Sequence, residues 1–357
     1  MKLLALVAYP LDTAPGQRYR IEQWAPYLAE HGVDVTFAPF ADPALAQLLY
    51  QPGRWVAKAI SMARASMARL EDAFAARHFD AVWVHREASL LGPAWAERLA
   101  HLRRPRLVYD FDDAVYLPYV SPTNRYLSYF KFPGKTKTLC RLSSVVIAGN
   151  PTLGEYARQY NGNVHVVPST ISLRSYRPRP HVRHDGLPVV GWTGSHSSAQ
   201  YLRLLAGPLE ELARRRPFRF LAIGAPQFSV PGVAVECRPW NARTEVEDLW
   251  GMDVGVMPLT DDPWAQGKCG MKALQYMGVG IPAVVSPVGV NREIVEHGRN
   301  GLHAATAEDW IGGLGALISD PGLRLRLGQQ ARRSVEERFS AEVHAPQVAA
   351  LIKSIVP

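Results

Sequence analysis

Short apolar segments alternate with helical ones along the chain, and this pattern occurs twice. The segments of strand length are residues 3–8, 33–38, 81–85, 106–109, 144–148 and 164–167, then 188–192, 218–223, 233–237, 254–257 and 281–285. Amphipathic stretches of helical length separate most of them. Strands that are apolar on both faces and alternate with helices are typical of parallel sheets covered by helices on both sides. The sequence therefore predicts an α/β protein with two doubly wound sheets.

Chain length and local composition indicate two domains. A chain of 357 residues is longer than one ordinary core requires. Residues 173–187 are rich in Pro and Arg and show little periodicity, so we expect a linker there. The predicted domains are residues 1–172 and 188–340, followed by a helix over 341–357. Ligands of such sheets bind beyond the carboxyl ends of the strands, so we expect the site in a cleft between the two halves.

The charge and the cysteines limit the class of partner. A formal net charge of +8 favours phosphorylated small molecules, an anionic membrane surface or nucleic acid. The basic residues are scattered and no nucleic-acid motif occurs, so no nucleic-acid partner is expected. The three cysteines lie far apart without metal-ligand spacing, and their scarcity suits a reducing cytoplasm. No run approaches the ~20 apolar residues of a membrane span, and we interpret the apolar start of the chain as a first strand.

Residues 267–290 have the pattern of a loop, a helix, a tight turn and a buried strand. Lys268 and Lys272 lie where the helix is expected to begin, next to the glycines of the loop. A helix N-terminus collects unpaired N–H groups and the positive end of the helix dipole, so cations there are favourable when an anion binds. The segment therefore predicts a phosphate site, although a single lysine at a helix start is more often a solvated surface residue.

A second polar cluster, Asp110-Phe111-Asp112-Asp113, follows a predicted strand. Three carboxylates in four residues repel one another unless a cation or a proton is shared. One interpretation is a metal-binding Asp-x-Asp pair. We favour a second one, in which Asp112 or Asp113 contacts sugar hydroxyls. A purely structural role, with Asp110 paired to an arginine and Asp113 capping a turn, is about equally consistent with the sequence.

The second half of the chain resembles the C-terminal domain of glycosyltransferase family 4. The motifs that carry the resemblance are Trp240, Pro258-Leu259, Gly267-Lys268-Cys269-Gly270, Lys272-Ala273-Leu274-Gln275-Tyr276-Met277, Gly280-Ile281-Pro282, Ser286-Pro287-Val288-Gly289 and Gly298-Arg299-Asn300-Gly301. It covers about residues 191–340, and continues more weakly through residues 16–20 and 85–87. The combination of motifs is specific, whereas each alone is weak.

The resemblance implies the GT-B fold: two Rossmann-like domains face each other across a cleft, and the last helix crosses back to the first. It implies a hexosyltransferase that moves a sugar from a nucleotide diphosphate donor, UDP- or GDP-sugar, to a hydroxyl acceptor. The acceptor class would be a sugar, a lipid-linked glycan or a small molecule, in polysaccharide or glycoconjugate biosynthesis. Family 4 enzymes retain the anomeric configuration without a protein nucleophile, a metal or another cofactor.

The chain departs from the family at the donor site. The family usually carries Glu-x7-Glu, and this sequence has Gly267 and Gln275 at those positions. The resemblance implies a ribose contact for Gln275, which keeps hydrogen-bonding capacity without charge. The family's Arg/Lys pair early in this domain is also missing. We expect Lys268 and Lys272 to bind the diphosphate instead, with Gly194, Ser195, Cys269, Gly270 and Met271 as further donor contacts, and Lys268 to stabilise the leaving group.

Residues of the first half are expected to lie near the acceptor. Gly16, Arg18 and Arg20 follow the first strand, where family members have a glycine-rich loop. The guanidinium group of either arginine can bind phosphate through two hydrogen bonds. The alternative is an ordinary surface loop. Arg86 ends the third strand, where it can pair with Glu87 or with an aspartate of the 110–113 cluster.

Alternatives remain for the activity and for one helix. The same fold serves nucleotide-sugar 2-epimerases, and the lost glutamates also suit a nucleotide-sugar-binding protein without turnover. In the helix expected over 55–77, Arg54, Lys58 and Arg69 share one face opposite an apolar one. We favour apolar packing on the sheet with the basic residues in water. The alternative is a peripheral contact with the anionic inner face of a membrane.

Overall fold

The computed structural model describes residues 1–104, 106–118, 132–180, 186–195, 198–225 and 227–356. The chain forms two compact units. The first comprises Met1–Ser169 and His344–Pro357, and the second comprises Thr170–Val343. Among the described residues, no helix is long and apolar enough to cross a membrane.

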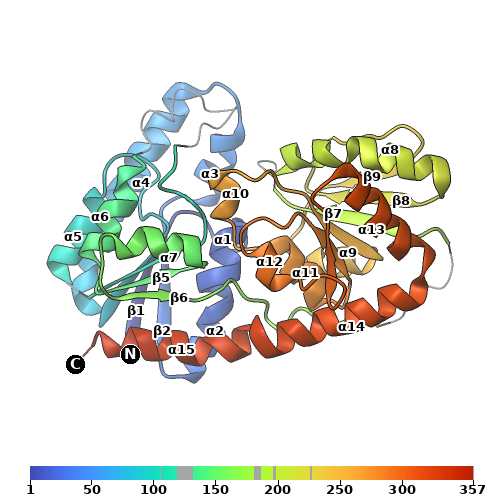
Figure 1. Cartoon of the computed structure of the whole chain (residues 1–357). Helices are drawn as coiled ribbons and strands as arrows, with labels where there is room; N and C mark the ends of the chain where they lie inside the picture. The colour runs from blue at the N-terminus through green and yellow to red at the C-terminus, as the bar shows by residue number, and fades with distance from the viewer. Residues whose placement is uncertain (105, 119–131, 181–185, 196–197, 226, 357) are drawn as a thin grey trace. The chain divides into compact units, whose positions relative to one another are not determined.

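The first unit is built on a six-stranded parallel sheet (Figure 1). Its order is β2 (Asp34–Pro39), β1 (Lys2–Val7), β3 (Ala81–His85), β4 (Leu107–Phe111), β5 (Val145–Ala148) and β6 (Val164–Val166). The strands β1, β3, β4 and β5 are buried almost throughout, as their continuous apolar sequences require. All strands run parallel, so their carboxyl ends share one edge of the sheet.

Helices cover both faces of this sheet. They are α1 (Pro15–Gln17), a π-helical turn η1 (Arg18–Glu22), α2 (Gln23–Glu30), α3 (Pro43–Tyr50), α4 (Trp55–Ala75), η2 (Ala76–His78), α5 (Trp95–Arg103), α6 (Gly134–Leu142), α7 (Pro151–Arg158) and α15 (Ala341–Ser354). Asp42 and Asn150 begin α3 and α7 by accepting hydrogen bonds from backbone N–H groups three residues later. From His344 onward, α15 belongs to the first unit, in agreement with the expected return of the last helix.

The second unit repeats the architecture. Its parallel sheet has the order β12 (Gly301–His303), β11 (Ala283–Val285), β10 (Val254–Met257), β7 (Val189–Thr193), β8 (Arg219–Ile223) and β9 (Ala234–Arg238). The three-residue β12 was not predicted, because so short a segment gives no periodicity. The helices are η4 (Ala199–Leu205), α8 (Ala206–Arg215), α9 (Glu245–Trp250), α10 (Pro263–Gln266), α11 (Met271–Gly278), α12 (Asn291–Ile294), α13 (Ala307–Ser319) and α14 (Pro321–Arg338).

The segment predicted as a linker, residues 173–187, lies partly in the second unit. The Tyr176 side chain is buried there, and Arg179 forms an ion pair with Asp253 at 3.2 Å. Residues 181–185 of that segment lie outside the described residues. Low periodicity identified an irregular segment, but it gave no sign that part of it packs on a core.

The favoured interpretation of the basic helix is wrong. In α4 the buried side chains are Lys58, Arg69 and Ala73, whereas Val56, Ile60 and Met67 are exposed. The Lys58 and Arg69 cations bond main-chain carbonyl groups at loop and strand ends, which compensates their burial. The helix therefore packs through its basic side and leaves apolar side chains outside.

Candidate functional site

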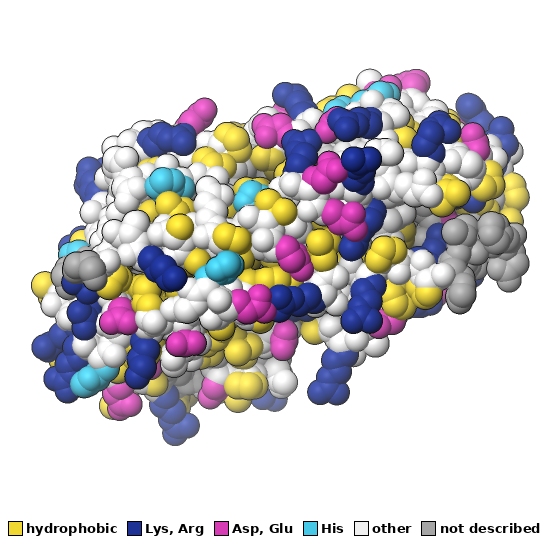
Figure 2. Space-filling model, turned by 90° about the horizontal axis from the view of Figure 1, so that it is seen from below, with side chains coloured by type: hydrophobic (Ala, Val, Ile, Leu, Met, Phe, Trp, Pro, Cys, Tyr) yellow, Lys and Arg dark blue, Asp and Glu magenta, His cyan; other side chains and the backbone are white. Residues whose placement is uncertain are grey.

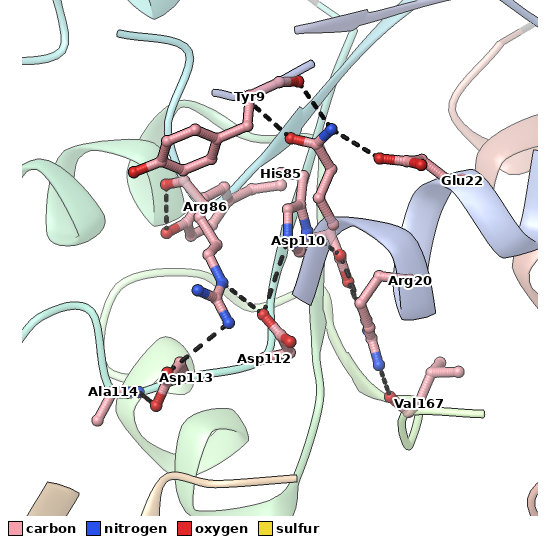
Figure 3. A network of polar contacts seen from close by, with 12 residues as sticks. Tyr9, Arg20, Glu22, His85, Arg86, Asp110, Asp112, Asp113, Ala114 and Val167 are labelled. Carbon is pink, nitrogen blue, oxygen red and sulfur yellow. Dashed lines mark hydrogen bonds and ion pairs between the residues drawn. The ribbon is translucent and has the colours of Figure 1, made fainter. Parts of the chain in front are cut away.

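Polar side chains of the first unit meet at the carboxyl ends of β3 and β4 (Figure 3). His85 is the last residue of β3 and lies beside Asp110 of β4 in the strand register. Asp112 and Asp113 follow directly after β4. The parallel pairing thus gathers one imidazole and three carboxylates at the edge of the sheet where α/β proteins bind ligands.

Asp110 is the buried centre of this cluster. Its carboxylate accepts hydrogen bonds from the Arg20 guanidinium and from Nδ1 of His85, the latter at 2.7 Å. Arg20 also donates to the carbonyl oxygen of Val167 at 2.6 Å, and both Arg20 and Asp110 are fully buried. Burial alone would raise the pKa of Asp110, but Arg20 and His85 hold it below its ordinary value. The pair therefore stays ionised inside the unit.

Asp112 is paired to Arg86. The distance from Nε of Arg86 to Oδ1 of Asp112 is 2.6 Å, and a second guanidinium nitrogen lies 3.7 Å from Asp113. Although burial acts to raise the pKa of Asp112, Arg86 and His85 keep it well below its usual range. Arg86 has a left-handed backbone, with φ of 58°, which is costly for a residue with a side chain and is typical of functional edges.

His85 retains hydrogen-bonding capacity at its second nitrogen. Its Nε2 atom lies 3.7 Å from Oδ1 of Asp112 and makes no hydrogen bond within the described part of the chain. The imidazole thus lies between two carboxylates, with Nδ1 toward Asp110 and Nε2 toward Asp112. A hydroxyl group at this point can donate to the Asp112 carboxylate.

The metal-binding interpretation of the aspartates does not fit this arrangement. Asp110 is neutralised by Arg20 and Asp112 by Arg86, so both carboxylates of the Asp-x-Asp pair already face cations. Within the described ranges, no group of three or more His, Cys, Asp or Glu side chains could hold a metal ion. The charge of each carboxylate is therefore already compensated by a guanidinium group.

The structure separates the residues predicted near the acceptor. It brings Gly16 against this cluster: a Cβ atom on Gly16 would lie 2.9 Å from an Asp112 carboxylate oxygen. Arg18 is mostly buried and lies 3.5 Å from Asp12. Arg20 is fully buried and bonds Asp110, so the prediction that it contacts an acceptor is corrected: its guanidinium is enclosed and positions the cluster instead.

Pairing within the 110–113 cluster was partly foreseen. The predicted pairing of Arg86 with an aspartate of the cluster is confirmed, and the predicted arginine partner of Asp110 is Arg20. Asp113 also accepts a hydrogen bond from the backbone N–H of the next residue, Ala114. Sequence reasoning did not assign the central position of His85, although a histidine that ends a buried strand was a signal for it.

In the second unit, the end of β7 meets the first turn of α11. A Cβ atom on Gly194 would lie 2.7 Å from Cε of Lys272 and 2.7 Å from the hydroxyl oxygen of Ser198. The Lys272 ammonium lies 5.7 Å from the centre of the Trp192 ring. Gly194 and Lys272 are thus direct neighbours, although they lie 78 residues apart in the sequence. Both were predicted as donor contacts. Ser195 follows Gly194, where the strand leads into η4.

The N-terminus of α11 carries no side-chain cap. Gly270 is its N-cap residue and has a left-handed backbone, with φ of 67°. Cys269 and Gly270 are buried, while Met271 and Lys272 are half-buried. Lys268 lies over the Trp264 ring of α10, at 5.8 Å, so the two lysines contact different elements. Of the two, Lys272 is the one beside the strand end.

Gln275 belongs to a buried hydrogen-bond chain. Its side-chain nitrogen donates to the Tyr176 hydroxyl at 3.0 Å, and that hydroxyl donates to Glu245 at 2.9 Å. Glu245 also accepts from the indole nitrogen of Trp240 at 3.1 Å. Sequence reasoning missed Tyr176 and Glu245, because neither lies near the 267–290 segment. The Glu245 carboxylate is thus connected to position 275, where the family has its second glutamate, through two hydrogen bonds that share the Tyr176 hydroxyl.

Comparison with known proteins identifies the second unit. Residues 187–320 match the family model described as glycosyl transferases group 1. This stretch of the second unit is therefore similar to a glycosyl transferases group 1 domain. Over 90 residues it is also 33% identical to an uncharacterized glycosyltransferase of Methanocaldococcus jannaschii, a match that covers 25% of this chain and only 22% of that relative.

Solved structures show that the chain has the GT-B fold. The sucrose-phosphate synthase of Thermosynechococcus elongatus superposes with a TM-score of 0.74 at 17% identity, over 99% of both chains. Anabaena HepE in complex with UDP and glucose superposes with a TM-score of 0.71 at 18% identity, over 99% of this chain and all of that one. Identities this low establish the fold and leave the reaction to the residues of the site.

Proposed function

We propose that the chain transfers a sugar from a nucleotide diphosphate donor to a hydroxyl acceptor. The observation that carries this proposal is the contact of Lys272 with Gly194, inside the glycosyltransferase domain and beside the uncapped N-terminus of α11. A cation, a helix N-terminus without a side-chain cap and a strand end without a side chain together favour a diphosphate. Ser195, Lys268, Cys269, Gly270 and Met271 surround this point in sequence and complete the proposed donor contacts.

The chemistry proposed for these residues is electrostatic. The donor diphosphate gains negative charge as the glycosidic bond breaks, so lysine ammonium groups stabilise the transition state more than the ground state. Lys272 and Lys268 supply that charge. The leaving phosphate accepts the proton of the acceptor hydroxyl, which gives retention without a protein nucleophile and without a metal ion.

The first unit is proposed to bind sugar hydroxyls. Asp112 and Asp113 present carboxylate oxygens, and Nε2 of His85 lies beside Asp112. Carboxylates that remain ionised accept strong hydrogen bonds from hydroxyl groups. Arg86 holds both aspartates in place while remaining about one-third exposed. The bare backbone of Gly16 leaves room for this pairing.

UDP-sugars are the first donors to test. HepE of Anabaena has been solved with UDP-glucose as well as with UDP and glucose. This supports a uridine donor here, and GDP-sugars are the second class. The chain would act on sugar, glycan or small-molecule hydroxyls in the synthesis of polysaccharides or glycoconjugates.

One assay separates this proposal from its rivals. Purified protein is incubated with UDP-, GDP-, ADP- and dTDP-sugars and a mixed acceptor panel, with and without EDTA, and products are analysed by mass spectrometry and NMR. Transfer with retained anomeric configuration, unaffected by EDTA, supports the proposal. An epimerised donor indicates a 2-epimerase, and calorimetric binding without any product indicates a nucleotide-sugar-binding protein. Transfer that persists at full rate in Lys272→Met excludes the assigned donor site.

A further inference from the structure

The outer face of α4 carries a regular apolar stripe. Its members are Val56, Ile60, Ala63, Met67, Leu70 and Phe74, which we call the α4 stripe. Their spacing of four and three residues in alternation places all six along one side of the helix. All are exposed, and the exposed fraction reaches 74% for Val56 and 68% for Met67. Exposed apolar surface of this regularity marks an interaction site.

The opposite side of α4 fixes the helix in this orientation. Lys58 donates to the carbonyl oxygen of Gln51 at 2.6 Å. Arg69 donates to Val7 at 3.0 Å and Ala38 at 2.8 Å, where β1 and β2 end, and pairs with Asp72 at 3.2 Å. Rotating the helix to hide the stripe would break these bonds and leave buried carbonyl groups without donors, so the apolar exposure is built in.

Arginines border the stripe. Arg64 is exposed on α4, and Arg77 is exposed just after it. At the far end, the Arg103 guanidinium of α5 lies 4.4 Å from the centre of the Phe74 ring, and Arg104 donates to the Arg77 carbonyl. The helix α5 packs beside α4 (Figure 1).

Acidic side chains are few on this surface. Glu71 is exposed, whereas Asp72 is engaged by Arg69. Leu102 of α5 adds a further apolar side chain that is 78% exposed. On the face shown in Figure 2, by contrast, basic and acidic side chains are interspersed. On α4 and α5 an apolar stripe and basic side chains thus lie together.

We propose that the α4 stripe and its arginine border dock on an anionic lipid bilayer. The apolar side chains would enter the boundary between headgroups and acyl chains, and the arginines would contact lipid phosphates. A second copy of the chain fits less well. If two copies paired through their stripes in antiparallel orientation, the symmetry axis would pass near residue 65, the middle of the stripe. Arg64 of one copy would then lie beside Arg64 of the second copy, and these like charges repel. Anionic lipid has the complementary charge for the whole border.

The test is flotation of the full-length protein with vesicles. One set contains phosphatidylcholine alone and the other contains 30 mol% phosphatidylglycerol, at about 0.15 M salt. We expect binding to the anionic vesicles at least about tenfold above binding to the neutral ones, decreasing as salt rises. Equal binding to both sets, or no binding to either, overturns the proposal.

Two variants assign the surface. Ile60→Asp with Met67→Asp should lower binding about tenfold or more, and so should Arg64→Glu with Arg103→Glu. The control is Leu325→Asp, an exposed leucine on α14 of the second unit, which should bind as the unsubstituted protein does. Circular dichroism melts verify that each variant folds. Sedimentation that reveals a dimer lost in Ile60→Asp/Met67→Asp would assign the stripe to a second copy and overturn the lipid proposal.

Discussion

The Nδ1 atom of His85 lies 2.7 Å from a carboxylate oxygen of Asp110, and both side chains are buried at the end of the sheet. Arg20 bonds the same carboxylate from the other side. A buried carboxylate between a cation and an imidazole fixes the ring orientation, so Nε2 of His85 points toward Asp112. Arg20 and Asp110 thereby fix the direction in which the His85 ring points.

Removing the cation of this pair should destabilise the first unit strongly. Arg20→Met leaves Asp110 charged and buried without its arginine, which costs about 3–5 kcal/mol of unfolding free energy. Urea denaturation monitored by circular dichroism measures it. Arg214→Met, which breaks an exposed ion pair on α8, serves as the control and should cost under about 1 kcal/mol. A loss in Arg20→Met no larger than that of the control contradicts the assignment.

Replacing Asp110 should change how the unfolding free energy depends on pH in acid. Its pKa in the folded state is held below the ordinary value, so its ionised form contributes stability above the unfolded pKa of about 4. That contribution is lost as the pH falls through the folded pKa. Asp110→Asn does not titrate there, so its unfolding free energy should fall less steeply than that of the unsubstituted protein below about pH 4. Parallel profiles for the two proteins would rule this out.

A side chain at Gly194 should weaken donor binding. In Gly194→Ala the added Cβ would lie 2.5 Å from the Trp192 ring and 2.7 Å from Cε of Lys272, so both side chains must shift and the lysine moves away from the strand end. Loss of one charge-assisted contact costs about 1.5–3 kcal/mol, or roughly ten- to a hundredfold in Kd for UDP measured by calorimetry. Gly207→Ala is the matched control, because no atom lies within 4 Å of its new Cβ. Unchanged UDP affinity in Gly194→Ala contradicts the proposed phosphate contact.

Much of the fold was predictable because it follows from local pattern. Buried parallel strands have continuous apolar sequences, so both sheets were expected, and the carboxyl ends of β3 and β4 placed Arg86 near Asp112. The polarity of α4 was not predictable in the same way. An amphipathic pattern defines two faces without saying which lies inside, and Arg69 is stabilised inside by carbonyl groups of residues far away in sequence.

The donor site shows the same division. Lys272 and Gly194 were both expected at the donor site, although the sequence did not predict that they would be direct neighbours. The partners of Gln275 were not expected, since Tyr176 lies 99 residues earlier in a segment without periodicity. A polar position on a helix is visible in the sequence, whereas its partner depends on packing between distant segments.

Restoring the family's glutamate at position 275 should destabilise the second unit. The Tyr176 hydroxyl has one proton, which it donates to Glu245, so a carboxylate in Gln275→Glu would face the hydroxyl oxygen without a donor. The expected cost is about 1–3 kcal/mol in urea denaturation. In the double variant Glu245→Gln/Gln275→Glu, the carboxylate is at position 275 and the amide at position 245, so the Tyr176 hydroxyl can again donate to one and accept from the other. This variant should recover most of the lost unfolding free energy. Equal stability of Gln275→Glu and the unsubstituted protein would show that this chain of bonds is not required.

Glu97 should make the first unit less stable as the pH rises. Its side chain is fully buried on α5, where one oxygen accepts the Ala88 N–H at 2.9 Å and the other has no hydrogen-bond partner in the described structure. Burial raises the pKa of Glu97, against the opposing effects of Lys135 and the Ala88 bond. A carboxyl whose folded pKa is raised contributes its stability fully below the unfolded pKa, about 4.3, and loses it as the pH rises through the folded pKa.

Glu97→Gln tests this sign directly. The amide oxygen keeps the Ala88 bond and does not ionise, so the variant should be more stable than the unsubstituted protein at pH 7. Its advantage in unfolding free energy should shrink steadily toward pH 4, where Glu97 is protonated in both states. Glu155→Gln, at an exposed position of α7 in the same unit, is the control and should show no such trend. An advantage that grows on acidification would mean that the Lys135 charge outweighs burial, because the carboxylate would then be the form that the fold prefers.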